Sequence, residues 1–264
     1  MGVTASHAFS APNLARTQIP VRSRHIRIIP DSEDAGHFGA ILRQQAAVAA
    51  ITARTRGAAT RLVGISRVED FQALIVRRGS RLRRGGDLRD QRIGLPAAHL
   101  QFGAPRVHAL RAAIAVLESE GLFFRGVEWV DLLPAEAVTC TLPSAYAAEM
   151  AALQAGSVDA VYVRGPAGLE AARVAGARVL VDVGAHRDPW LRTHTALLHT
   201  VTVNETLLQE HPDVIAQELL QRWPLLPPRL SLDAQSLGAL ETLKIFMFRW
   251  AFIRADFTMD TWTD

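Results

Sequence analysis

The chain has 264 residues, of which 49% are hydrophobic and 21% are charged, so it has enough apolar material to bury a core. The formal net charge is only +3, and 28 of the 29 basic residues are arginines, Lys244 being the one lysine. These arginines form no basic face interleaved with aromatic residues and no helix-turn-helix pattern, which argues against nucleic-acid binding. The single cysteine, Cys140, excludes an intrachain disulfide and a cysteine-based metal cluster. No run reaches the roughly 18 apolar residues of a membrane-spanning helix.

The first third of the chain predicts a strand, a helix and two further strands. Residues 1–23 lack periodicity, and they also lack the basic and apolar regions of an export signal, so the protein as written is expected in the cytoplasm. Residues 25–29 alternate polar and apolar as in a strand, and 40–56 form an Ala-rich helical pattern. The apolar runs 62–65 and 73–76 have the length of buried strands.

From residue 92 onward the pattern is a regular alternation of strands and helices. Strands are predicted at 92–95, 127–132, 159–163, 178–183 and 196–204, and helices at 105–121, 145–155 and 166–175. An amphipathic helix follows Asn204, and a long helix carries Leu237, Leu240, Leu243, Met247 and Trp250 on its apolar face. Such an alternation implies a mostly parallel sheet that helices cover on both faces.

The sequence carries none of the motifs that mark a cofactor site or a catalytic centre. GxGxxG, GxxxxGK[ST] and GxSxG are all absent, so neither a phosphate-binding loop nor a nucleophile elbow is predicted. His194 and His199 are five residues apart, a spacing that matches no helical zinc pair, and no two carboxylates form a recognisable acid–base couple. We therefore expect no cofactor and no metal, and the motifs name no catalytic residue.

The candidate ligand-binding residues lie instead in loops at the ends of predicted strands. His99, Gln101 and Phe102 stand between a strand and the start of a helix, where free backbone N–H groups attract anions. Arg164 and Gly165 follow a later strand and precede another helix. Arg164 could form a bidentate contact with a carboxylate, a sulfonate or a phosphate. The alternative is that all of these are ordinary polar loop residues.

The opposite wall of such a cleft would come from earlier in the chain. The segment His37, Phe38 and Gly39 is one candidate, and Arg67 and Asp70 are weaker ones. Ligands of α/β folds bind beyond the carboxyl ends of the strands, so these residues are expected to face the loops that carry Arg164.

Several segments, taken in chain order, resemble a known family. They are residues 60–65, 73–76, 87–95, 153–160 and 204–215. Over about residues 58–264 they resemble the solute-binding proteins of sulfonate, taurine and nitrate ABC transporters. The resemblance implies an α/β, two-lobe periplasmic-binding-protein type II fold, in which each lobe is a mostly parallel sheet flanked by helices and the lobes close on a ligand by a hinge. It also implies a small organic anion, such as an aliphatic sulfonate or taurine, as the ligand and an ABC permease as the partner.

Within that superfamily the strand pattern and the C-terminal segments 240–241 and 259–262 resemble most the branch that contains the hydroxybiphenyl sulfinate desulfinase. That branch uses a cysteine near its N-terminus, which is missing here, and Cys140 belongs to the other lobe. The segment His37-Phe38-Gly39 corresponds to an Arg-Phe-Gly-Gly stretch of the branch, with histidine in place of arginine. A thiolate mechanism therefore does not carry over. An enzyme of this branch would have to cleave the C–S bond of an aryl sulfinate with water oriented by His37 or His99.

The resemblance also divides the chain into two lobes. Residues 1–87 and 197–264 would form the first lobe, and residues 88–196 the second. Family members carry a strand, a ligand-contacting loop and a helix ahead of the segment that 24–30 matches, whereas only residues 1–23 precede it here. Either the chain is truncated, and the protein is periplasmic, or residues 1–23 rebuild that unit. Beside the binding protein and the desulfinase-like enzyme, a truncated and inactive remnant is therefore the third reading.

Overall fold

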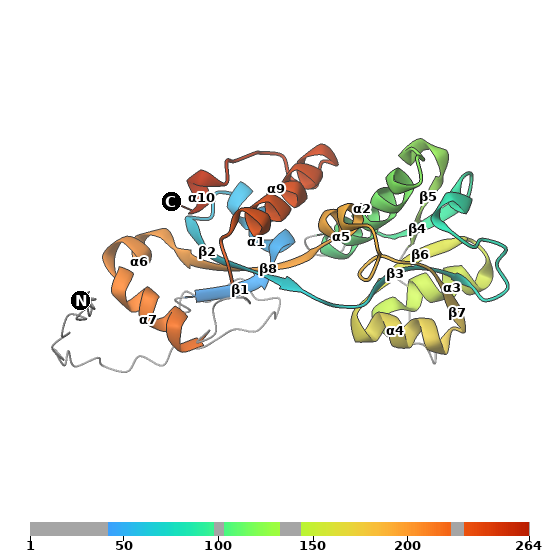
Figure 1. Cartoon of the computed structure of the whole chain (residues 1–264), viewed down its shortest axis with the longest axis horizontal. Helices are drawn as coiled ribbons and strands as arrows, with labels where there is room; N and C mark the ends of the chain where they lie inside the picture. The colour runs from blue at the N-terminus through green and yellow to red at the C-terminus, as the bar shows by residue number, and fades with distance from the viewer. Residues whose placement is uncertain (1–41, 98–102, 133–143, 223–229, 264) are drawn as a thin grey trace, which may run out of the picture.

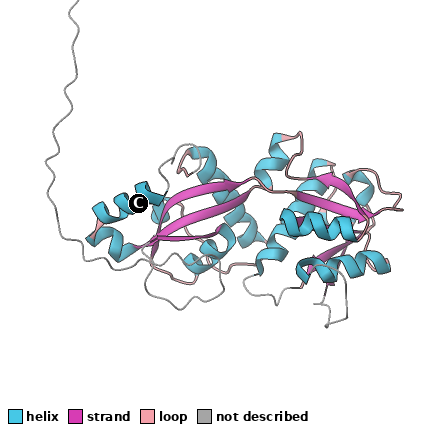
Figure 2. Cartoon of the chain, turned by 90° about the horizontal axis from the view of Figure 1, so that it is seen from below, coloured by secondary structure: helices cyan, strands magenta, loops and turns pink. Residues whose placement is uncertain are grey.

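The computed structural model describes residues 42–97, 103–132, 144–222 and 230–263, which form two lobes (Figure 1). Within this part of the chain, one lobe holds a three-stranded sheet and the other a five-stranded sheet. Figure 2 shows the two sheets as separate magenta layers, each flanked by helices. No described helix is both long and apolar enough to cross a membrane. The strand predicted at 25–29 and the environment of Cys140 lie outside the described residues.

The first lobe is built on strands β1 (Leu42–Ala46), β8 (Leu197–Asn204) and β2 (Thr60–Val68), in that spatial order. The central strand β8 is antiparallel to both neighbours. Helices α1 (Ala47–Thr55) and α9 (Ala234–Arg249) cover one face, where Ile51, Leu62 and Met247 belong to one buried cluster. The remaining helices of this lobe are α6 (Glu205–Glu210), α7 (Pro212–Arg222) and α10 (Asp260–Thr263).

The helix predicted over 40–56 is wrong in its first part, because residues 42–46 form strand β1 and the helix begins at Ala47. Along β1 every residue from Leu42 to Ala46 pairs with β8, and the Leu42 side chain is buried against that sheet. The Gln-Gln-Ala sequence has no strong strand propensity of its own. The backbone partners that β8 offers therefore decide the conformation, which a local pattern cannot register.

The C-terminal tail closes the first lobe. Trp262 is completely buried, and Arg54 and Arg61 each donate a hydrogen bond of 2.9 Å to the carbonyl oxygen of Thr261. Lys244, the single lysine, is itself buried and forms an ion pair of 2.6 Å with Asp256. The C-terminal tail is thus an integral part of this lobe's core.

The second lobe contains the sheet β5 (Glu128–Leu132), β4 (Arg92–Pro96), β6 (Ala160–Arg164), β3 (Gln72–Arg77) and β7 (Ala177–Asp182), in that order. Helices α2 (Ala104–Ser119) and α5 (Pro189–His194) pack on one face of it, and α3 (Ala147–Ala155) and α4 (Gly165–Val174) on the other. Short 3₁₀ turns occur at η1 (Gly85–Leu88), η3 (Phe124–Gly126) and η4 (Ser144–Tyr146). Strands β4, β5 and β6 are parallel, and only β3 runs against its neighbours β6 and β7. The predicted mostly parallel sheet with helices on both faces is confirmed for this lobe, whereas for the first lobe it is wrong, because β8 pairs antiparallel with both of its described neighbours.

The crossing between lobes comes earlier than the boundary predicted at residue 88. Strand β3 lies inside the second lobe's sheet, so the chain crosses at residues 69–71. Five consecutive residues of β3 are buried because the strand is flanked by β6 and β7 and covered on both faces. The chain returns between β7 and β8, and there the backbone N–H of Val183 donates a hydrogen bond of 2.8 Å to the carbonyl oxygen of Gln72. The two crossing segments therefore lie side by side.

Candidate functional site

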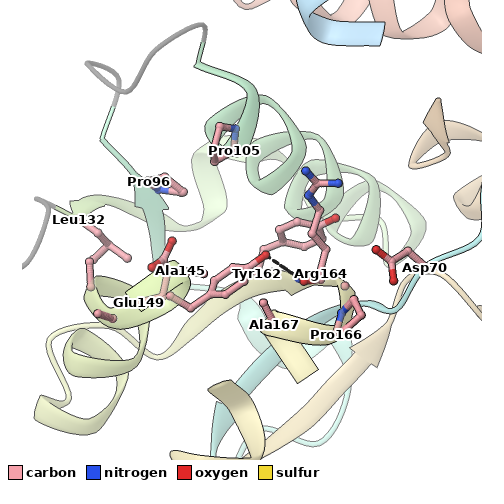
Figure 3. A pocket seen from close by; sticks show the side chains of 14 residues that line it. Asp70, Pro96, Pro105, Leu132, Ala145, Glu149, Tyr162, Arg164, Pro166 and Ala167 are labelled. Carbon is pink, nitrogen blue, oxygen red and sulfur yellow. Dashed lines mark hydrogen bonds between the residues drawn. The ribbon is translucent and has the colours of Figure 1, made fainter. Parts of the chain in front are cut away.

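A cavity of about 600 Å³ lies at the edge of the second lobe's sheet where its parallel strands end (Figure 3). Pro96, Leu132 and Arg164 are the last residues of β4, β5 and β6, and all three line the cavity. The first turns of α2, α3 and α4 supply most of the remaining wall. We call this space the Arg164 cavity. It occupies the position at which α/β folds hold their ligands, because parallel strands deliver their carboxyl ends to one edge.

Arg164 is fixed through its backbone, while its side chain is left available. Its N–H donates a hydrogen bond of 3.0 Å to the Tyr146 hydroxyl oxygen, and that hydroxyl donates one of 3.1 Å to the Arg164 carbonyl oxygen. The guanidinium group makes no hydrogen bond or ion pair with any other residue in the described part of the chain. Figure 3 shows it directed away from β6, beside Tyr162. A half-buried guanidinium without a carboxylate partner favours an anion from outside the chain.

Gly165 connects the crossing segment 69–71 to the start of α4. Its φ of +67° is the left-handed region, and a Cβ added there would lie 2.9 Å from an Asp70 carboxylate oxygen. Its N–H donates a hydrogen bond of 2.7 Å to the carbonyl oxygen of Phe71. Only glycine fits both the backbone conformation and the close contact. The crossing segment 69–71 is therefore anchored directly to the cavity wall.

Three helices begin at the cavity, and none of them has a side-chain cap. The N-cap residues Gly103 of α2, Tyr146 of α3 and Arg164 of α4 make no capping hydrogen bond with their side chains. The helices therefore lack the usual side-chain acceptor for their first N–H groups, although the Gly165 N–H already donates to the carbonyl oxygen of Phe71, and Pro105 and Pro166 have no N–H. The helix dipoles add partial positive charge at the same place. Convergent helix amino ends of this kind attract anions.

Two carboxyl groups also line the cavity. Glu149, in the first turn of α3, is buried, and this burial raises the pKa of its carboxyl group. Asp70 accepts a hydrogen bond of 3.0 Å from the backbone N–H of Phe71 and lies at the start of α4. The lining thus contains a guanidinium group, three helix amino ends and two carboxyl groups. Burial disfavours the charged form of one carboxyl group, that of Glu149, and the other belongs to Asp70 in the crossing segment.

Behind Arg164, α2 contributes a histidine and an arginine that are both buried. The pKa of His108 is lowered to about 3, first by burial and then by the positive charges of Arg164, Arg111 and His199. Burial also lowers the pKa of Arg111 to about 10. One Arg111 nitrogen, Nη1, donates a hydrogen bond of 3.1 Å to the carbonyl oxygen of Ala196, and Nη2 has no partner among the described residues. Because His199 lies on β8, these charges meet where the second lobe faces the first.

The structure brings together only part of the predicted site. Arg164 and Gly165 line the cavity, as does Asp70, whereas Arg67 lines a smaller hollow at the hinge. The predicted residues His99, Gln101, Phe102, His37, Phe38 and Gly39 lie outside the described residues. No group of three or more His, Cys, Asp or Glu side chains that could hold a metal occurs in the part of the chain that is described.

Tyr146, His108 and Arg111 are absent from the sequence-based prediction. Tyr146 directly precedes a helix that starts at the cavity, and this position was the signal that could have indicated it. His108 and Arg111 lie within α2, where the sequence shows them only as polar residues among apolar ones. Their burial depends on α5 and α1 packing beside α2, which no local pattern predicts.

Neither a protein-family model nor a curated protein matches this chain, but solved structures do. The desulfurization enzyme DszB superposes with a TM-score of 0.62 at 21% identity, over 84% of this chain and 82% of the enzyme. The periplasmic aliphatic sulphonate binding protein SsuA from Escherichia coli superposes with a TM-score of 0.59 at 15% identity, over 85% of this chain and 79% of SsuA.

A third structure is the alkanesulfonate-binding protein SsuA from Xanthomonas axonopodis pv. citri, bound to MOPS. It superposes with a TM-score of 0.55 at 18% identity, over 85% of this chain and 80% of that protein. Similarity at this level of identity establishes the arrangement of the elements. The chain therefore has the two-lobe periplasmic-binding-protein type II fold, which it shares with sulfonate-binding proteins and with a desulfurization enzyme.

Proposed function

We propose that the protein binds a small organic anion, of the aliphatic sulfonate or taurine type, in the Arg164 cavity of its second lobe. The observation that carries this proposal is the Arg164 guanidinium, which has no partner among the described residues and stands where three uncapped helices begin. A sulfonate offers three oxygen acceptors to such donors. The N–H groups and the guanidinium can satisfy them without a counter-ion from the protein.

The rest of the cavity suits an organic tail. Its volume of about 600 Å³ is within the range of small-molecule sites, and Pro96, Pro105 and Leu132 supply an apolar wall. The Asp70 carboxylate could accept hydrogen bonds from an amino group, so an aminosulfonate is as suitable as an alkanesulfonate. We further propose that the protein delivers this ligand to an ABC permease, since a periplasmic sulfonate-binding protein of a sulfonate ABC transporter shares the fold.

Substitution of Arg164 tests the proposal. Calorimetric titration with ethanesulfonate and taurine should show binding, and Arg164→Ala should weaken it about 10- to 100-fold, since a hydrogen bond to a charged group contributes about 1.5–3 kcal/mol. Arg164→Lys should recover only part of the affinity, because it keeps the charge and loses the planar fork. Arg173→Ala is the matched control, since that arginine is exposed on α4 and pairs with Glu170.

A ligand that binds the folded state at about 100 times its Kd should also raise the free energy of unfolding by about 2.7 kcal/mol. A thermal-shift screen of alkanesulfonates, carboxylates and pyrimidine-like anions provides this second measurement. If none of these anions shifts the melting temperature at millimolar concentration, or if Arg164→Ala binds as well as the unmodified chain, the proposed function is wrong.

A further inference from the structure

A second hollow, of about 590 Å³, lies on the other side of the start of α2. Its walls come from both lobes: from the C-terminal ends of α1 and α9 in the first, and from β4, α2 and the segment 124–129 in the second. Figure 1 shows α9, in red, extending from the first lobe toward the second. Four aromatic residues and two arginines dominate its lining, namely Phe124, Trp129, Trp250, Phe252, Arg56 and Arg106. We call this hollow the aromatic groove.

The aromatic rings of the groove are held in place by their neighbours. The indole N–H of Trp129 donates a hydrogen bond of 2.9 Å to the carbonyl oxygen of Phe124. The Phe124 ring meets Trp250 edge-on, with 5.3 Å between ring centroids, and Phe246 packs against Trp250 at 6.0 Å. Phe124 nevertheless remains 41% exposed. Rings that are already fixed and still accessible can bind a flat ligand with little further loss of conformational entropy.

The groove also contains two arginines. Arg106 is fixed by an ion pair of 2.6 Å with Asp131 and by a hydrogen bond of 2.8 Å to the carbonyl oxygen of Pro96. Asp131 is itself 61% exposed and does not line the groove, and neither does any other carboxylate among the described residues. With Arg56, the lining contains two guanidinium groups and no carboxylate of the described residues, so it offers N–H donors to an acidic group even though Asp131 balances the charge of Arg106.

We propose that the aromatic groove is a second ligand site, separate from the Arg164 cavity, for a planar aromatic carboxylate or sulfonate. The ring of the ligand would pack against Trp129 and Trp250, and its acidic group would face the arginines at the rim. Because Trp250 belongs to the first lobe and Trp129 to the second, an occupied groove would bridge the lobes. The site does not depend on what the Arg164 cavity binds.

Titration with 2-naphthoate tests the proposal, with cyclohexanecarboxylate as the non-aromatic control of equal charge. We expect 2-naphthoate to bind at least about tenfold more tightly than the control, which corresponds to the contribution of aromatic contacts. Trp129→Leu should weaken the binding of 2-naphthoate by about tenfold or more. Trp190→Leu, which removes a partly exposed tryptophan that does not line the groove, and Arg164→Ala should leave it unchanged.

Other results would overturn the inference. Absence of binding at millimolar 2-naphthoate would do so, and so would a loss of binding in Arg164→Ala without a loss in Trp129→Leu, since the anion would then occupy the Arg164 cavity. Phe124→Ala provides a second variant if Trp129→Leu does not fold, because Phe124 lies at the surface and its carbonyl group is retained. Saturation with ethanesulfonate should leave the affinity for 2-naphthoate within about twofold, and competition between them would place both ligands in one site.

Discussion

The backbone of Arg164 is fixed by hydrogen bonds, while its side chain is free to contact a ligand. Its backbone N–H and carbonyl oxygen are bound by one tyrosine hydroxyl, so the end of β6 is fixed while the side chain has no described partner. The neighbouring Gly165 allows the chain to turn directly into α4. If Arg164 binds an anion as proposed, its backbone is already fixed and only the side chain has to be ordered, and this reduces the cost of binding.

His108 should make stability depend on pH. Its pKa in the folded state, about 3, is lower than the 6.5 of an ordinary histidine because burial and nearby positive charges oppose protonation. The unfolded chain therefore binds this proton below pH 6.5 and the folded chain does not, so stability is complete above pH 6.5 and falls as the pH drops toward 3. The loss attributable to this residue between pH 7 and pH 5 should be about 1–2 kcal/mol.

Urea unfolding at several pH values measures this effect. His108→Gln has no proton to take up at this position, so its free energy of unfolding should fall less between pH 7 and pH 5 than that of the unmodified chain. His194→Gln is the matched control, since that ring is stacked on Trp190 at the surface. Equal pH slopes for His108→Gln and the unmodified chain would show that His108 is not the group responsible.

At the residue scale, sequence reasoning predicted part of the site and missed part of it for a physical reason. Arg164 and Gly165 follow a strand and precede a helix, and this local pattern is enough to indicate a ligand-facing loop. His108 acquires its character from burial beside Arg111 and from His199 of the other lobe. Such long-range contacts leave no trace in the local sequence.

Helices α2 and α9 end in the same motif, the first with glycine and the second with alanine at the left-handed position. After α2, the N–H of Leu122 donates a hydrogen bond of 2.8 Å to the carbonyl oxygen of Leu117, and Gly121 between them has a φ of +68°. After α9, the N–H of Phe252 bonds to Met247 at the same distance, 2.8 Å, and Ala251 has a φ of +57°. Both are Schellman ends, in which glycine is the favoured residue at the left-handed position.

Ala251→Gly should therefore stabilise the protein by about 0.5–1 kcal/mol, because it removes the strain of a left-handed alanine at some cost in unfolded-state entropy. Gly121→Ala is the reciprocal variant and should destabilise by about 1 kcal/mol, since no atom lies within 4 Å of the added Cβ and only the backbone strain remains. Chemical denaturation of both variants measures the pair. Destabilisation by Ala251→Gly would contradict the assignment of strain to this residue.

The elements themselves differ in how well the sequence predicts them. Helix α9 was predicted from the spacing of Leu240, Leu243 and Met247, and these residues are indeed buried together. Strand β1 was predicted as helix because its alanine and glutamine residues favour a helix locally, and β8 overrides that preference. A strong apolar periodicity therefore predicts the secondary structure correctly, whereas tertiary contacts can override a weak local propensity.

For the whole molecule, the two lobes have different cores, and both aromatic and charged residues lie at the joint between them. The described apolar clusters lie mainly within one lobe or the other, although Phe246, Trp250 and Phe252 also pack against the second lobe's core. The predicted boundary at residue 88 followed the start of the β–α alternation. It fell too late because β3 pairs with strands that come much later in the chain, and this pairing is non-local.

Arg111 lies between the two lobes and behind the proposed anion-binding residue Arg164. It lies on α2 of the second lobe and donates its hydrogen bond to Ala196, where the chain returns to the first lobe. Arg111 is 4% exposed, and its Nη2 has no partner among the described residues. A buried charge that lacks a carboxylate partner costs stability, and replacing it with an apolar group of similar length is often neutral or stabilising.

Arg111→Met should therefore have a free energy of unfolding equal to that of the unmodified chain or up to about 1 kcal/mol higher. It should nevertheless bind sulfonates about three- to tenfold more weakly, because one of the positive charges behind Arg164 is lost. Urea unfolding and calorimetric titration, carried out on the same preparation, separate the two effects. Arg89→Met, at an exposed position in the second lobe, is the control for loss of charge alone. If Arg111→Met were clearly less stable and bound sulfonates normally, Arg111 would be a structural tie between the lobes, without a part in attracting the ligand.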